Sequence, residues 1–353
     1  MTGRERVRLA LAHKETDRIP IAMVCSGINE PARTEFDAYL KRKGRGPLSD
    51  YLRSILDIVT VGPRYVGPPL DPGVDIWGVR RQPRQCGLAV YDEIEDSPLA
   101  CAGSVDDIVR HRWPGTDLFD YSVLPERIAA VQRDGERCIM VANGNIFETS
   151  WYMRGFQQMF TDMVLEPELA QAILERVAEF YIEHFRRMLA AARGEVDLVF
   201  TADDIAGQQG LLMSLDLWER LIKPHHARLN AVIHEYGARV IYHSDGAVMN
   251  AIPGLLDMGI DVLQALQFDA AGMDARRMKE SYGERLSFEG GVSVQKTLPF
   301  GTPEQVREEV EFLITTLGKG GGYILGPSHA IQAGTPPENI LAMFETALNC
   351  RPR

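Results

Sequence analysis

The sequence has few cysteines, and they are not arranged as a disulfide framework. Their number is odd, they are widely scattered, and no CxxC pair occurs; the five are Cys25, Cys86, Cys101, Cys138 and Cys350. Small extracellular scaffolds instead carry an even number of cysteines at short spacings. The pattern suits a reducing compartment, and we expect a cytoplasmic protein.

Long hydrophobic runs and an excess of positive charge are also missing. No stretch reaches the roughly 18 apolar residues of a membrane-spanning helix. Segment 1–18 carries charges among its apolar positions, which predicts neither a signal peptide nor a membrane span. The formal net charge of −11 argues against a nucleic-acid-binding protein, although a site can be locally positive inside an acidic protein. We therefore expect no nucleic-acid partner and no membrane partner.

The commonest hydrolase and nucleotide-binding motifs are absent as well. No Gly-x-Ser-x-Gly, no Walker A sequence and no GxGxxG at a strand–helix junction occurs. The glycines at 320–322 precede a strand and not a helix, so we interpret them as a helix stop and not as a phosphate-binding loop.

The rest of the composition is that of an ordinary globular protein with a large core. Hydrophobic residues make up 45% and charged residues 25% of the 353 positions. The length would allow two domains, but closed α/β barrels reach it as one domain with insertions. We therefore expect a single domain over residues 1–353.

Eight short apolar runs, each typical of a buried strand, occur along the chain. They are residues 18–25, 57–61, 138–144, 197–204, 239–246, 261–267, 286–292 and 322–329. Amphipathic helical patterns precede the first run and separate several later ones, at 4–14, 167–192, 214–237 and 302–320.

This alternation of strand and helix predicts parallel strands with right-handed crossovers. Eight such units predict an α/β protein with a (β/α)8 TIM barrel, preceded by a helix at the N-terminus; an open doubly wound sheet is the alternative. Residues 62–136 are irregular and rich in proline and glycine, so we interpret them as an insertion that forms part of the active-site wall.

Polar residues stand at the carboxyl ends of four later strands, where a packed core would reject them. They are Asp203 with Asp204, residues 243–246, Glu289, and Ser328 with His329. In a parallel barrel the strand carboxyl ends and the loops that follow them form the active site. We therefore expect these side chains to share one pocket.

The pair His243 and Asp245 is the most informative of these. Both side chains reach one metal ion if the backbone turns sharply after the strand, and Gly246 permits that turn. With His329 as a third ligand, they form a standard zinc set with an open position. Two other interpretations remain open: a metal-free acid or base, and a purely structural histidine.

Several further residues are candidates with a structural alternative for each. Asp203 and Asp204 would orient substrate, raise the pKa of a neighbouring histidine or bind the metal. The structural alternative is that they cap a helix. His225 and His226 are adjacent in a helix, point about 100° apart and are expected to be structural. Four aromatic or basic residues are expected at the entrance, although most aromatic residues pack in a core. They are Tyr65, Trp77, Tyr152 and Arg154.

Five segments together resemble the uroporphyrinogen decarboxylase superfamily, whose fold is a (β/α)8 barrel. They are RERVRLALAHKETDRIPI, DIWGV, DDIAGQQGLLMSLDLWERLIKPHHARL, YHSDGAVMNAIPGLLDMGIDVLQALQ and GGYILGPSHAIQAGTPPENILAM. The resemblance extends over nearly the whole chain, and the last three segments are specific.

The resemblance implies one of two chemistries. Uroporphyrinogen decarboxylase proper carries an N-terminal Arg-Gln-Ala-Gly-Arg segment that holds the substrate carboxylates, and residues 23–29 here contain no arginine. The other branch is similar to corrinoid-dependent methyltransferases, which bind zinc through a His-x-Cys motif and a later Pro-Gly-Cys. In this sequence Asp245 and His329 replace the two cysteines, which indicates a harder site that activates an ether or hydroxyl.

The resemblance therefore favours a methyltransferase that acts on a small methylated or methoxylated substrate with a corrinoid (cobalamin) carrier protein as partner. It implies Zn²⁺ on His243, Asp245 and His329, and a homodimer is one option for the assembly. Asp203, Asp204 and Glu289 would complete the polar shell. The expected substrate-binding residues are Asp57, Tyr65, Tyr152, Arg154 and Gln208. The alternatives are a cofactor-free decarboxylase that uses Asp57, Asp204 and His329, and a tetrapyrrole-binding or corrinoid-binding barrel without turnover.

Overall fold

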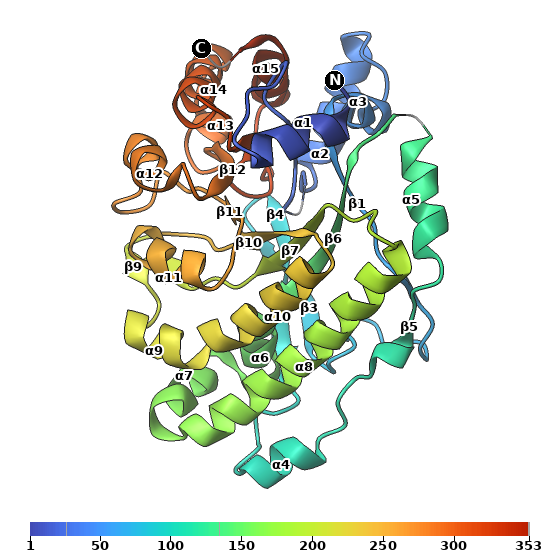
Figure 1. The fold of residues 1–353 in the computed structure, drawn as a ribbon, viewed down its shortest axis with the longest axis vertical. Helices are drawn as coiled ribbons and strands as arrows, with labels where there is room; N and C mark the ends of the chain where they lie inside the picture. The colour runs from blue at the N-terminus through green and yellow to red at the C-terminus, as the bar shows by residue number, and fades with distance from the viewer. Residues whose placement is uncertain (26, 134, 352–353) are drawn as a thin grey trace.

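A curled sheet of seven parallel strands forms the centre of the molecule (Figure 1). The computed structural model describes residues 1–25, 27–133 and 135–351. In spatial order the strands are β1 (Ile58–Thr60), β6 (Cys138–Asn145), β7 (Leu198–Ala202), β10 (Arg239–His243), β11 (Val262–Gln264), β12 (Ser287–Val292) and β13 (Tyr323–Pro327). Each coincides with one of the predicted apolar runs. The arrangement is TIM-barrel-like.

The two edge strands of this sheet are connected through the segment around Ile21. Ile21 forms a parallel bridge with Leu325 of β13. On its other side, the Ile21 carbonyl accepts a hydrogen bond of 2.9 Å from the backbone N–H of Asp57, just before β1. The first predicted strand is reduced to this bridge because the Asp57 carboxylate, and not a neighbouring backbone, accepts the Ile21 N–H at 2.8 Å.

Helices lie on the outside of the sheet (Figure 1). The longer ones are α2 (Ala32–Arg42), α8 (Pro167–Ala192), α10 (Lys223–Glu235), α14 (Pro303–Leu317) and α15 (Pro337–Asn349). The shorter ones are α3 (Leu48–Ile55), α5 (Leu124–Gln132), α6 (Ile146–Arg154), α7 (Phe156–Leu165), α9 (Leu215–Leu221), α11 (Ile252–Asp257), α12 (Ala275–Tyr282) and α13 (Thr297–Phe300). Of the helices described, none is long and apolar enough to cross a bilayer.

The helix α1 (Gly3–Leu11) covers the amino-terminal end of the sheet. Thr2 and Glu5 form a capping box at its start, which satisfies two backbone N–H groups. Its buried Val7 packs in a small cluster of interior side chains from the strands, among them Ile58, Met140 and Ile324. Because this end is covered, an open site is left to the opposite end, where the strands terminate.

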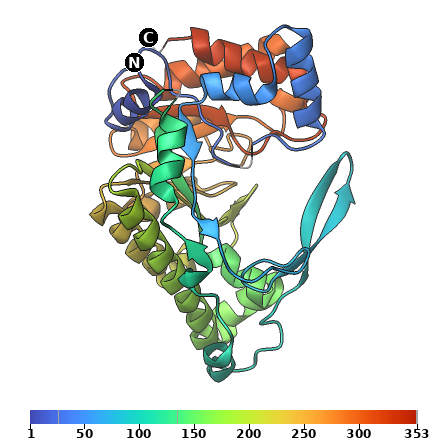
Figure 2. The same cartoon turned by 90° about the vertical axis from the view of Figure 1, so that its right-hand side faces the viewer.

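Segment 62–136 is more regular than its composition indicates. It contains β2 (Arg64–Tyr65), β3 (Arg80–Cys86), β4 (Ala89–Asp96), α4 (Val105–Arg110), η1 (Thr116–Leu118) and β5 (Phe119–Asp120). β3 and β4 form an antiparallel hairpin that projects from the body of the molecule (Figure 2). Near its tip, the Tyr91 hydroxyl donates to Gln332 Oε1 at 2.7 Å, so the hairpin contacts the loop that follows β13.

Candidate functional site

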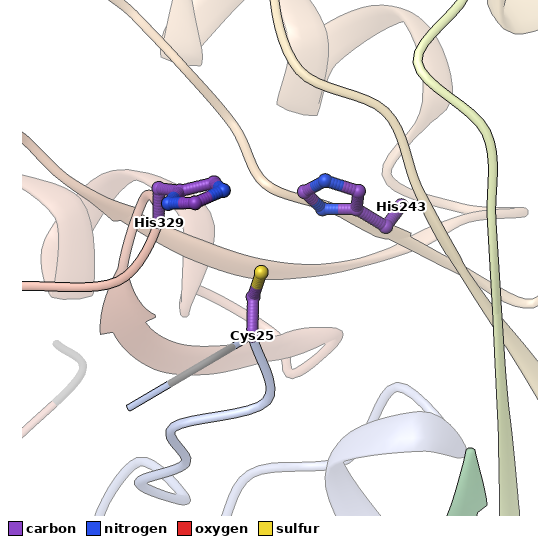
Figure 3. Close-up of side chains that lie close together, drawn as sticks. All are labelled: Cys25, His243 and His329. Carbon is purple, nitrogen blue, oxygen red and sulfur yellow. The ribbon is translucent and has the colours of Figure 1, made fainter. Parts of the chain in front are cut away.

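Two histidines face each other at the carboxyl ends of the strands (Figure 3). His243 is the last residue of β10, and His329 follows β13; their ring centroids are 6.0 Å apart. Cys25, which follows the Ile21 segment, lies between them, and the potential ligand atoms of all three are within 4.8 Å of one another. Asp204, His243 and Asp245 form a second such group. The sheet therefore brings five potential metal ligands together from four segments.

Asp245 lies between the two histidines. Its Oδ1 is 3.8 Å from His243 Nε2, and its Oδ2 is 3.8 Å from His329 Nε2. The predicted trio of His243, Asp245 and His329 is thus in one place, with one carboxylate oxygen toward each ring. Oδ1 is buried and accepts no hydrogen bond from the described residues. A buried carboxylate oxygen without a donor is suited to a cation.

His243 is held in the tautomer that a metal site requires. Its Nδ1 forms a short hydrogen bond with the side-chain oxygen of Gln264, at the end of β11. Because an amide oxygen only accepts, Nδ1 carries a proton, and Nε2, 3.5 Å from Asp204 and 3.8 Å from Asp245, is the nitrogen left to bind a metal. The ring is also almost buried, with 8% of its side chain exposed. Both features fix its direction.

Glu289, on β12, interacts with the side chain of Gln264 and belongs to neither of the two groups of potential metal ligands. Burial raises the pKa of its carboxyl well above the usual range, and the Gln264 amide offsets this only partly. Burial therefore favours the protonated form of this carboxyl. It packs against Gly326 of β13, where a Cβ would stand 2.6 Å from Glu289 Oε1.

The turn after β10 has the sharp geometry that the sequence predicted. Gly246 has a φ of 86°, and a Cβ there would lie 2.5 Å from the carbonyl oxygen of Gly207. Asp204 Oδ1 accepts the backbone N–H of Asp245 at 2.7 Å. Gln267 Oε1 accepts the N–H of Gly246 at 2.9 Å and the amide of Gln208 at 3.0 Å. These bonds hold Asp245 in place, so Gln208 acts on the site through Gln267.

Asp203 is fully buried and directed away from the histidine pair. Its two oxygens accept the backbone N–H groups of Phe147 and Glu148, at 2.8 Å each, at the start of α6. One oxygen also bonds His226 Nε2 at 2.5 Å. Burial raises the pKa of Asp203, and His226 opposes this rise. Asp203 thus joins β7, α6 and α10, while its neighbour Asp204 faces His243 at 3.5 Å.

Glu148 connects this cluster to a cavity. Burial raises the pKa of its carboxyl to about 8, and the charges of Asp204 and Asp203 add to the rise. Its Oε2 accepts a hydrogen bond of 2.5 Å from Asn145. Asn145 and Tyr152 line a cavity of about 730 Å³ whose walls include Trp77, Phe119, Phe180 and Tyr181. Its lining residues do not include the two histidines, Asp204, Asp245 or Cys25, so the link between them runs from Glu148 through Asn145.

Replacing Glu148 by glutamine should raise stability at alkaline pH and leave it unchanged at acid pH. The folded-state pKa of about 8 exceeds the ordinary value of 4.5, so the folded protein holds the proton more tightly than the unfolded chain. That contribution to stability is complete below about pH 4.5 and is lost as pH rises through about 8. Because glutamine does not titrate, Glu148→Gln should have a larger free energy of unfolding than wild type at pH 8, by at most about 4 kcal/mol. Urea unfolding at pH 5 and pH 8 measures it.

The exposed Glu308 is the matched control for this measurement, since it lies on α14, away from the cluster. Glu308→Gln should shift the unfolding midpoint equally little at both pH values. An equal change at pH 5 and pH 8 in Glu148→Gln would show that Glu148 titrates as an ordinary surface glutamate.

Three expected substrate-binding residues are not brought to this cluster. Asp57 precedes β1 at the amino-terminal end and forms ion pairs with Arg6 at 2.6 Å and Arg18 at 2.7 Å. Arg154 is buried against Asp162 at 2.7 Å and backbone carbonyls of residues 99–102. The Tyr65 hydroxyl donates to the carbonyl of Pro68 in segment 62–136. Each of these three side chains already bonds to neighbours in its own part of the fold. Tyr152, by contrast, lines the cavity.

Four residues of the cluster were not predicted: Cys25, Glu148, Gln264 and Gln267. Gln264 and Gln267 stand at the end of the sixth apolar run, which has polar residues at its carboxyl end like its neighbours. Counting amides together with charged groups would have found both. Cys25 is the last residue of the first run, and Glu148 comes four residues after the third run. The common signal is a polar or thiol side chain within four residues of a strand end.

The family model described as uroporphyrinogen decarboxylase (URO-D) matches residues 120–349. A uroporphyrinogen decarboxylase of Pseudoalteromonas translucida is 23% identical over 291 residues, which are 77% of this chain and 76% of that protein. A methylated-thiol–coenzyme M methyltransferase of Methanosarcina mazei is 27% identical over 196 residues, 56% of this chain and 49% of that protein. A solved methyltransferase from Methanosarcina mazei has a TM-score of 0.69 at 18% identity over 98% of each chain, which shows a shared fold.

Proposed function

The chain belongs to the uroporphyrinogen decarboxylase family, and from this premise we propose that it is a methyltransferase. It would move a methyl group between a small methylated compound and a cobalamin that a partner protein carries. The observation that carries the proposal is the grouping of His243 and His329 with carboxylates and a thiol at the strand ends. Side chains of these types commonly bind metals, whereas a porphyrinogen with many carboxylates needs fixed cations.

The residues present fit a zinc ion. His243 has its Nδ1 engaged by Gln264, which leaves Nε2 for a metal, and the buried Oδ1 of Asp245 accepts no hydrogen bond from the described residues. Imidazole nitrogen and carboxylate oxygen are common zinc ligands, and a third protein ligand leaves a position for substrate. We propose that His243, His329 and Asp245 hold the ion. When bound, zinc would act as a Lewis acid on the heteroatom that the methyl group leaves or joins.

The charge around the cluster favours a neutral or cationic substrate over a polycarboxylate. Asp204 and Asp245 lie beside His243, and Asp204 is close enough to Glu148 to raise the pKa of that carboxyl. Among the described residues that line the cavity, Arg81 is the one with a permanent positive charge, and Asp75 neutralises it at 2.6 Å. Five aromatic side chains in the walls suit a flat or methylated ligand.

The chain itself would place the substrate and supply a proton. The aromatic walls would orient the methylated compound, and the hydrogen bond from the backbone N–H of Asp245 would hold the Asp204 carboxylate in place. Glu148 is protonated at neutral pH because burial raises its pKa to about 8. We propose that it donates this proton to the oxygen or nitrogen from which the methyl group departs.

The test is a methyl-transfer assay with the zinc-loaded protein. The protein is incubated with cob(I)alamin and, in turn, aryl methyl ethers, methylated amines and methyl thioethers, and the absorbance of methylcobalamin is followed. We expect methylcobalamin to form with at least one donor class and its formation to stop when the metal is removed by a chelator. Re-addition of zinc should restore the rate.

Two results would contradict the proposal. Release of CO2 from uroporphyrinogen by metal-free protein would identify a decarboxylase, the activity named for the Pseudoalteromonas relative. Tight binding of cobalamin without formation of methylcobalamin from any donor would identify a binding protein without turnover.

A further inference from the structure

We propose that Cys25 supplies a thiolate to the same metal ion that His243 and His329 hold. The loop after the Ile21 segment would then contribute a permanent ligand, and the ligand set would be one sulfur and two imidazole nitrogens. Asp245 would be the exchangeable fourth ligand that substrate displaces. This inference rests on the metal centre of the proposed function, but not on methyl transfer.

The position of Cys25 is the first argument. Its Sγ and one nitrogen of each ring are mutually within 4.8 Å (Figure 3). Ligand atoms around a tetrahedral zinc ion, at about 2.0–2.3 Å from it, are about 3.5 Å apart. Small rotations about the side-chain bonds of Cys25 and His329 close the difference. His329 has the freedom to rotate, since 32% of its side chain is exposed.

The carboxylates are less well placed for a permanent role. Asp245 points a different oxygen at each histidine. Asp204 Oδ1 is 3.5 Å from His243 but already accepts the backbone N–H of Asp245. The sulfur of Cys25, by contrast, is a single atom near both rings. It is therefore the third donor that one ion shares with both histidines.

The backbone around Cys25 fixes it against the loop that carries His329. Before it, the N–H of Ala22 donates to the carbonyl of Leu325 at 2.9 Å. After it, the N–H of Ile331 donates to the carbonyl of Gly27, and the N–H of Asn29 donates to the carbonyl of Ile331, at 2.9 Å each. The two loops are thus paired on both sides of the proposed ligands. Such pre-positioning lowers the entropy lost when a metal binds.

Metal binding by Cys25 releases one proton. The thiol of Cys25 loses its proton to solvent as the sulfur–metal bond forms, because the thiolate is the ligand. A set of two nitrogens and one sulfur selects zinc over magnesium or calcium. It also differs from a carboxylate set in a way that spectroscopy detects.

Cobalt(II) in place of zinc tests the inference. The wild-type protein loaded with cobalt(II) should show an intense near-ultraviolet sulfur-to-cobalt charge-transfer band. Cys25→Ser should lose this band and weaken zinc binding by about 100-fold or more, since loss of a residue that only orients a ligand already costs about 10–100-fold. Cys101→Ser, at an exposed cysteine in segment 62–136, is the matched control and should keep the band.

A second measurement uses the wild-type protein alone, so it does not depend on the folding of a variant. Bound zinc should protect Cys25 from alkylation by iodoacetamide, read by mass spectrometry of its peptide, while the exposed Cys86 reacts equally with and without zinc. Cobalt(II) binding without a charge-transfer band, alkylation of Cys25 at the same rate in both conditions, or no metal binding would each overturn the inference. Methyl transfer without the band would overturn it and leave the proposed function standing. The band without methyl transfer would support the Cys25 ligand and contradict the proposed function.

Discussion

Replacing His243 by alanine should lower methyl transfer by at least about 10³-fold and remove most of the bound zinc. His243 belongs to both groups of potential ligands, so its loss breaks every ligand set that the cluster offers. A metal ion that polarises the departing atom is worth several kcal/mol, and each 1.36 kcal/mol is about tenfold in rate. Initial rates of methylcobalamin formation and the zinc content of the purified protein measure the two effects.

His234→Ala is the matched control. His234 lies on the exposed surface of α10 and bonds Asp261 at 2.8 Å, so it has a carboxylate partner but no place at the cluster. This variant should keep its zinc and its rate within about twofold, because surface substitutions usually change stability by about 0.5 kcal/mol or less. If His243→Ala keeps full zinc and a rate within tenfold of wild type, the metal centre lies elsewhere.

The strands could be predicted from the sequence because of what a parallel sheet requires. Both faces of such a sheet are covered, so its strands are continuous apolar runs and not alternating ones. β12 is buried at every position and was predicted from LSFEGGV. Their ends could be predicted for the same reason: a charged group such as Asp204 directly after a buried run marks the point where the strand leaves the core.

The helix prediction was less accurate where a single proline interrupts the pattern. The run 214–237 was predicted as one helix, but the structure has α9 and α10, separated at Ile222. Pro224 has no N–H to donate and its ring crowds the preceding turn, so a new helix begins there. The apolar stripe continues across the break, and periodicity alone therefore conceals it.

The membership of the cluster was harder to predict than its location. Which strand ends meet depends on how the sheet curls, and spacing along the chain does not encode that. Cys25 and His329 are close because the Ile21 segment bonds β13, the last strand. Residues 23–29 differ from the family pattern by the arginines that they lack, and nothing in their sequence marks the thiol of Cys25 as a ligand. Asp203 and Asp204 show the same limit, since adjacent residues after one strand point in opposite directions.

Replacing Asp57 by asparagine should destabilise the protein by about 3–5 kcal/mol, the cost of leaving buried charges without their partner. Asp57 is 3% exposed and accepts hydrogen bonds from Arg6, Arg18 and the backbone N–H of Ile21. Asparagine keeps the shape of the side chain but leaves the two arginines without that charge. The midpoint and slope of urea unfolding measure the loss.

Asp17→Asn provides the control for the Asp57 measurement, because Asp17 bonds the same Arg6, at 2.7 Å, from a side chain that is 42% exposed. Asp17 is open to solvent on its own side, so this variant should lose less stability than Asp57→Asn. The same experiment decides whether Asp57 acts on substrate, as the decarboxylase alternative requires. Its place at the amino end of β1 predicts that folded Asp57→Asn retains full activity at low temperature. A variant of normal stability without activity would instead put Asp57 in the reaction and reopen that alternative.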